Sequence, residues 1–247
     1  MTRCIMDPMS KSKNAGPDSA DPTAHPAGEY APAEMTLDEL RPVLVRDMLP
    51  DVAFDGWGWE AAEAAAERLD VPAERVKLLF PAGPIDMIVA WLRIADEDML
   101  AALSAEGVSD MKIRDRIRRA VEIRLEQAEP NKEAVREASK ILAYPRHAMT
   151  SVRSLWTTVD AMWRIAGDTA TDYNYYTKRG ILSGVYSSTL LYWLQDDSED
   201  FADTRAFLSR RIDNVMQFEK GKAELLRAKR RLPSISRFFG RLRYPGV

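Results

Sequence analysis

The sequence is poor in the side chains that most enzymes use. It holds one cysteine, Cys4, and two histidines, His25 and His147, among 247 residues. A single cysteine excludes an internal disulfide and a metal site built on several thiolates, and it fits a reducing compartment. His147 has no local partner of the kind that general-base catalysis requires, so we interpret it as a helix-start or surface residue. We therefore predict that the chain is not an enzyme.

Two classes of motif are also missing. The sequence has no Glu-x-x-His pair, which excludes a ferritin-like di-iron bundle, and it has no glycine-rich phosphate loop. Asp168 and Asp172 could be imagined as metal ligands, but Asp before an apolar run is far more often an N-cap. We expect helix caps, no metal and no cofactor. What remains is a protein that binds something.

Long apolar runs are absent as well. No stretch approaches the ~20 apolar residues of a membrane-spanning helix, and the N-terminus has the composition of neither a signal nor a transit peptide. The expectation is a soluble or peripheral protein in the cytoplasm, on the inner face of the cell membrane.

Net positive charge is confined to the C-terminal end. The net charge is −3, yet residues 219–247 carry nine Lys or Arg against two Glu, which leaves the rest at −10. Apolar and basic residues alternate there in the pattern of a helix that lies in a membrane interface. The predicted membrane contacts on an anionic surface are Leu232, Ile235, Arg237, Phe238, Phe239, Arg241 and Leu242. The alternative is that the apolar residues fold back onto the body or onto a dimer partner.

Helical periodicity dominates the chain, and no alternating strand is convincing. Residues 1–36 form a predicted disordered, Pro-rich tail, and 37–83 a predicted helix-turn-helix-like subdomain. Residues 84–218 form the predicted helical lipid-binding domain. The expected helices run from Leu37 toward Pro50, with Pro42 in the first turn, then over Glu60–Leu69, Ala73–Phe80, Ile85–Leu103, Met111–Glu129, Lys132–Leu142, Ser151–Ile165, Tyr173–Leu194 and Asp203 to about Arg231. The fold class is all-α.

Two of these helices carry apolar stripes that should line one interior. The predicted lipid contacts on them are Val159, Trp163, Leu182, Val185, Tyr186 and Leu190. Small residues such as Gly180 and Gly184 either admit another helix closely or leave room for a ligand. Both interpretations remain open at this stage.

Tyr173, Tyr175 and Tyr176 cannot all be buried, because consecutive helical positions point in different directions. With Lys178 and Arg179 beside them, they resemble an interaction surface. Half-buried tyrosines at a helix start are the equally weighted alternative.

Several segments together resemble the Coq-nine family of ubiquinone-biosynthesis lipid-binding proteins, in its bacterial form. They are Trp163, Ala166-Gly167-Asp168, Asp172, Tyr176-Thr177-Lys178-Arg179, Gln195-Asp196, Asp200-Phe201, Asp203-Thr204 and Phe207-Leu208. The resemblance is dense over residues 151–216 and looser over 41–142.

The resemblance implies a tetracycline-repressor-like homodimer that binds an isoprenoid lipid or quinone intermediate without catalysing a reaction. It also implies membrane binding through the C-terminal helix, and presentation of the quinone to the di-iron demethoxyubiquinone hydroxylase. The implied hydroxylase contacts are Met162, Asp172, Tyr175, Tyr176 and Arg179.

The alternative is a tetracycline-repressor-like, DNA-binding transcriptional regulator with an apolar ligand. Its recognition helix would be residues 72–80, which offer Arg75 and Lys77 but also Glu74 and an apolar end. Weak phosphate affinity is expected from an acidic body, so nucleic acid is an unlikely partner.

Overall fold

The computed structural model describes residues 31–168 and 173–215, and within these ranges it is all-α, as predicted. The helices are α1 Leu37–Asp55, α2 Trp59–Arg68, α3 Ala73–Leu79, α4 Pro84–Glu106, α5 Ile113–Ala128, α6 Lys132–Leu142, α7 Ala148–Ile165 and α8 Tyr173–Trp193. Short 3-10 turns lie at Pro32–Glu34, Val108–Asp110, Glu129–Asn131, Pro145–His147 and Glu199–Phe201. Residues 202–215 are helical too.

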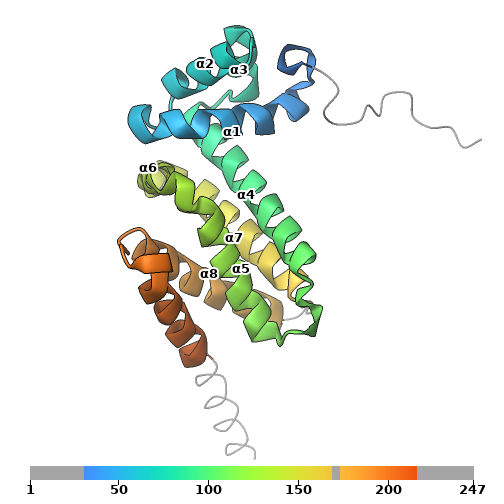
Figure 1. Cartoon of the computed structure of the whole chain (residues 1–247), viewed down its shortest axis with the longest axis vertical. Coiled ribbons are helices and arrows are strands. Elements are labelled where there is room, and N and C mark those ends of the chain that lie inside the picture. The colour runs from blue at the N-terminus through green and yellow to red at the C-terminus, as the bar shows by residue number, and fades with distance from the viewer. Residues whose placement is uncertain (1–30, 169–172, 216–247) are drawn as a thin grey trace, which may run out of the picture.

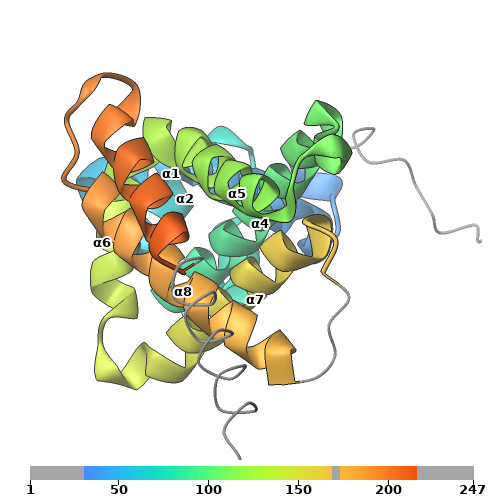
Figure 2. The same cartoon turned by 90° about the horizontal axis from the view of Figure 1, so that it is seen from below.

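The helices form two groups. Figure 1 shows α1, α2 and α3 together at one end of the molecule, and α4 running from them along the other helices. Seen from below, α4, α5, α7 and α8 surround a common core (Figure 2). No single helix in the described ranges is long and apolar enough to span a bilayer; α3 and α4 pass that test only together, as a pair bent by 73°.

The first helix begins earlier than its prolines suggest. Thr36 and Glu39 form a capping box, in which the Glu39 amide donates to the Thr36 hydroxyl and the Thr36 amide to the Glu39 carboxylate. Pro42 therefore lies in the second turn, and the predicted first-turn position was wrong. Residues 1–30 of the predicted tail lie outside the described residues, whereas Pro32–Glu34 already form a turn.

The same helix continues past Pro50 to Asp55, five residues beyond the expected end. Pro50 is exposed, while Met48, Leu49 and Val52 around it are buried. Burial of these apolar side chains offsets the backbone hydrogen bond that proline cannot make. The helix ends at Gly56, whose φ of 71° favours glycine.

A tryptophan pair joins the two groups of helices. Trp57 packs on Trp91 of α4, with ring centroids 5.2 Å apart, and its indole Nε1 donates to the carbonyl of Ala134 on α6 at 2.9 Å. Both indoles are buried. The α1–α3 end is thus fixed directly to the core that holds the predicted ligand helices.

Candidate functional site

Three aromatic rings gather where α7 meets the start of α8. Tyr175 and Tyr176 pack edge to face at 5.1 Å, and their centroids lie 6.3 and 6.1 Å from that of Trp156. Tyr176 is 64% exposed, whereas Trp156 and Tyr175 are half-buried. We call Trp156, Tyr175 and Tyr176 the aromatic patch. One ring faces out and another is half-buried, so the patch has the exposure that an interaction surface needs, and the interaction itself stays a prediction.

A buried arginine supports this patch from beneath. Arg179 is 2% exposed; its Nε donates to Asp160 Oδ1 at 2.5 Å and its Nη1 to Asp168 Oδ2 at 3.0 Å. Its guanidinium lies 3.5 Å from the Tyr175 ring centroid, and the Tyr175 hydroxyl donates to Asp160 at 3.0 Å. Burial by itself would lower the pKa of Arg179, but the hydrogen bonds that Arg179 donates to the two carboxylates outweigh it and raise that pKa. The guanidinium is therefore a fixed cation.

The five implied hydroxylase contacts differ in how exposed they are. Tyr176 is exposed and Tyr175 half-exposed, so both can touch a partner. Met162 and Arg179 are buried inside the chain, which corrects their expected direct role, because each can act only through the residues above it. Asp172 lies outside the described residues. Asp168 was expected to cap a helix, which stays a prediction; its carboxylate pairs with Lys178 at 2.6 Å and with Arg179.

Sequence reasoning missed two members of this site. Trp156 lies on the apolar stripe of α7, which was expected to face the interior, yet it packs against the exposed tyrosine at the surface. Asp160 is a single acid within an apolar stripe, next to Val159, and that position was the available signal for a buried ion pair.

The predicted lipid residues share one core, as expected, and two of them border a small cavity. Val159, Leu182, Val185 and Tyr186 are buried, and Trp163 and Leu190 pack against them. Tyr186 and Leu190 line a cavity of about 50 Å³, and the other four residues do not line it. Ligand pockets for drug-sized molecules hold roughly 300–1,000 Å³. Lipid binding at these six residues stays a prediction.

Gly180 and Gly184 also face away from the interior. Both are exposed, and a side-chain carbon added at either position would meet nothing within 4 Å. Arg179 and Leu182, in contrast, occupy the buried face of α8. Among the described residues nothing packs against either glycine, so close helix packing and ligand space at these positions both stay predictions.

A second buried polar cluster lies between α4, α5 and α7. The Thr158 hydroxyl donates to both carboxylate oxygens of Asp96 at 3.0 and 2.9 Å, and Arg124 Nε donates to Asp96 Oδ1 at 3.3 Å. Burial raises the pKa of Asp96, with Arg124 and Thr158 opposing the shift. The sequence did not single out these residues, because Asp96 and Arg124 each stand among other charged residues.

The predicted membrane contacts, Leu232, Ile235, Arg237, Phe238, Phe239, Arg241 and Leu242, all lie outside the described residues. Membrane binding stays a prediction.

The comparisons with known proteins point in one direction. The COQ9 family model matches residues 148–219, which include the aromatic patch. "Ubiquinone biosynthesis protein COQ9, mitochondrial" of Xenopus tropicalis is 32% identical over 197 residues, covering 77% of this chain and 62% of that protein. COQ9-B of Xenopus laevis is 32% identical, covering 77% and 67%, and COQ9 of Rattus norvegicus is 30% identical, covering 83% and 69%. The chain thus spans less than two thirds of the Xenopus tropicalis protein.

A solved structure resembles the fold as a whole. The TetR transcriptional regulator from Nitrosomonas europaea superposes with a TM-score of 0.58 at 24% sequence identity, covering 70% of this chain and 96% of the regulator. The likeness confirms the predicted tetracycline-repressor-like fold and nothing beyond the fold.

Proposed function

Because this chain belongs to the COQ9 family of ubiquinone-biosynthesis proteins, we propose that it serves that pathway as a non-enzymatic accessory protein. In this proposal it binds an isoprenoid lipid or quinone intermediate and presents it to the di-iron demethoxyubiquinone hydroxylase. It works as a homodimer on an anionic membrane surface.

The aromatic patch is the observation that carries the proposal. Exposed tyrosine beside half-buried aromatic rings has the composition of an interface centre, where Tyr, Trp and Arg are enriched. Its position within the region matched by the family model supports the aromatic patch as the surface through which the hydroxylase would dock.

The network below the patch supports the same role. Arg179 holds the Tyr175 ring on one side and two carboxylates on the other, so the Tyr175 ring has little freedom left. A surface that is rigid before binding loses less conformational entropy when a partner arrives. A stable interface can therefore form on a few aromatic contacts.

Binding to the purified hydroxylase tests this proposal. Tyr176→Ala removes the most exposed ring and should weaken association by ~1–3 kcal/mol, with the unfolding temperature nearly unchanged. Phe54→Ala is the control, because Phe54 is 90% exposed on α1, at the other end of the molecule. Equal affinity of both variants and the unmodified protein would rule out the aromatic patch as the docking surface.

The alternative, a DNA-binding regulator, draws on the fold alone. On α3, Arg75 donates to the backbone carbonyls of Ala33 and Met35, so it is committed within the chain. The exposed residues of the same helix include Glu74 and Leu78 beside Lys77. This surface should bind phosphate groups weakly, because Arg75 is held by backbone carbonyls and the acidic Glu74 lies on the same helix as Lys77.

A further inference from the structure

We infer that Arg124 and Trp91 bind the head of an uncharged amphiphile that carries a carbonyl oxygen, and that its apolar tail lies against Tyr186 and Leu190. The inference deepens the proposed function, on which it rests, by naming where and how the lipid-like ligand is held.

Arg124 is the starting observation. It is 4% exposed, and its Nε donates to Asp96. Among the residues that the structure describes, neither terminal nitrogen of its guanidinium has a hydrogen-bond partner. Neither nitrogen is among the fully buried side-chain atoms that lack a partner, so both open onto accessible space. Each can therefore donate to an acceptor that enters from that space.

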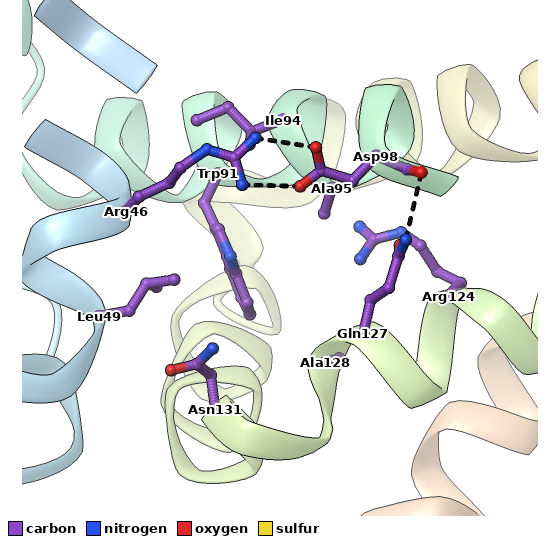
Figure 3. A pocket seen from close by; sticks show the side chains of 10 residues that line it. All are labelled: Arg46, Leu49, Trp91, Ile94, Ala95, Asp98, Arg124, Gln127, Ala128 and Asn131. Atoms are coloured by element: carbon purple, nitrogen blue, oxygen red, sulfur yellow. Dashed lines mark hydrogen bonds and ion pairs between the residues drawn. The ribbon is translucent and has the colours of Figure 1, made fainter. Parts of the chain in front are cut away.

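These nitrogens face a polar cavity of about 90 Å³ between α1, α4 and α5 (Figure 3). Leu49, Trp91 and Ile94 give it apolar walls, and Figure 3 shows the Trp91 indole reaching down between Leu49 and Asn131. Flat apolar walls with one convergent set of donors suit a planar group that bears an acceptor oxygen.

The charges around the cavity indicate that the ligand head is uncharged. Arg46 donates to both carboxylate oxygens of Asp98 at 2.8 Å, and this bridge lies across one side of the cavity. Arg124 is paired with Asp96. Each arginine already has its carboxylate, so an anionic head would bring an unbalanced charge into a buried site. A carbonyl oxygen accepts from the guanidinium without that cost.

A second cavity provides the place for the tail. Trp91, Arg124 and Ala128 also border the apolar cavity of about 50 Å³, whose other walls include Val135, Tyr186 and Leu190. One side of this shared wall is thus polar and the other apolar. A molecule with a polar head and an apolar tail matches that order.

Trp91 must move for such a ligand to enter. Each cavity is smaller than the ~150 Å³ apolar cavity that holds benzene in an engineered protein. The indole of Trp91 borders both spaces, so its rotation joins them. Tryptophan fluorescence should therefore change on binding.

The first test uses a benzoquinone with a ten-carbon tail, titrated against the full chain and followed by tryptophan quenching and equilibrium dialysis. Removing Arg124 alone would leave Asp96 buried and unpaired, so the double variant Asp96→Asn with Arg124→Met is compared with Asp96→Asn. The double variant should bind about 10- to 100-fold more weakly, the loss expected for hydrogen bonds from a charged donor. Exposed Arg93→Met on α4 should bind like the unmodified protein. Equal binding by the double variant and Asp96→Asn would overturn the inference.

A second test fills each cavity separately. Ala95 borders the polar cavity but not the apolar one, and Ala138 borders the apolar cavity but not the polar one. Ala95→Leu should weaken binding of both the tailed quinone and a tail-less benzoquinone, whereas Ala138→Leu should weaken only the tailed one. Tighter binding of decanoate than of the quinone would contradict an uncharged head.

The two proposals can fail separately. If the quinone binds but neither Leu variant weakens it, the ligand lies elsewhere and the inference alone fails. Loss of hydroxylase docking bears on the proposed function alone, because the aromatic patch shares no residue with either cavity.

Discussion

Arg179 is the residue on which the candidate docking site depends most. It contacts Asp160 on α7, Asp168 just after α7, and the ring of Tyr175 on its own helix. A buried ion pair adds little net stability compared with apolar packing, but the loss of one partner leaves charge buried and unpaired. Here that loss would leave two carboxylates without their buried cation, although Arg164 still pairs with Asp160 and Lys178 with Asp168.

We predict that Arg179→Met lowers the free energy of unfolding by about 3–5 kcal/mol. Arg164→Met is the matched control, because Arg164 also pairs with Asp160, at 2.7 Å, but is 73% exposed in its side chain. An exposed pair contributes about 0–1 kcal/mol. Chemical denaturation measures both. Similar small losses for the two variants would mean that Arg179 has no special structural role.

At the scale of elements, the turn that follows α8 is held by one carboxylate. Asp196 accepts from the amides of Ser198 and Thr204, each at 2.9 Å, and from the Thr204 hydroxyl at 2.5 Å. This arrangement holds a turn in which Asp200 and Phe201 have φ values of 51° and 53°. Burial by itself would raise the pKa of Asp196, but these hydrogen bonds outweigh it and hold the pKa at about 2.

The pH dependence of stability follows from that pKa. Because the folded-state value lies below the unfolded one, the contribution is present above roughly pH 4 and is lost as pH falls toward 2. The contribution is ~2 kcal/mol. We predict that Asp196→Asn is less stable at neutral pH and loses less stability than the unmodified protein between pH 4 and pH 2. Urea denaturation across this pH range measures the free energy of unfolding of both proteins. Equal losses of stability in the two proteins would contradict the assignment.

Element positions were predicted better from the sequence than the ends of elements or the site. The helix predicted over Lys132–Leu142 has the same bounds as α6, because the apolar periodicity and the flanking helix breakers agree there. Pro50 misled at α1, since burial on one face outweighed the local propensity of proline. The Asp160–Arg179 pair and the Asp96–Arg124 pair could not be predicted, because each joins residues from different helices and depends on tertiary packing.

At the scale of the whole molecule, the tryptophan pair brings the α1–α3 end next to the polar cavity. Trp57 packs on Trp91, and Arg46 of α1 pairs with Asp98 of α4 beside the same cavity. A ligand that moved Trp91 would therefore also shift the packing of α1 and α2 against α4.

Membrane binding is predicted from the sequence of the C-terminal end. Removing residues 232–247 takes away the two phenylalanines Phe238 and Phe239 and the arginines beside them. Each basic residue near an anionic leaflet contributes about 1 kcal/mol. Vesicle co-sedimentation of the full chain should rise with anionic lipid and fall with salt, and the truncated protein should stay in solution while remaining folded. Unchanged sedimentation of the truncated protein would place the membrane contact on the helical body.

The central claim is that this protein carries a lipid of the quinone pathway. Mass spectrometry of lipids extracted from the purified full-length protein tests it most directly, with Ala95→Leu purified in parallel. The account predicts that isoprenoid or quinone species co-purify with the unmodified protein and are depleted in the variant. A protein that carries no such lipid, and that instead retards operator DNA in a gel-shift assay, would contradict the account and favour the regulator.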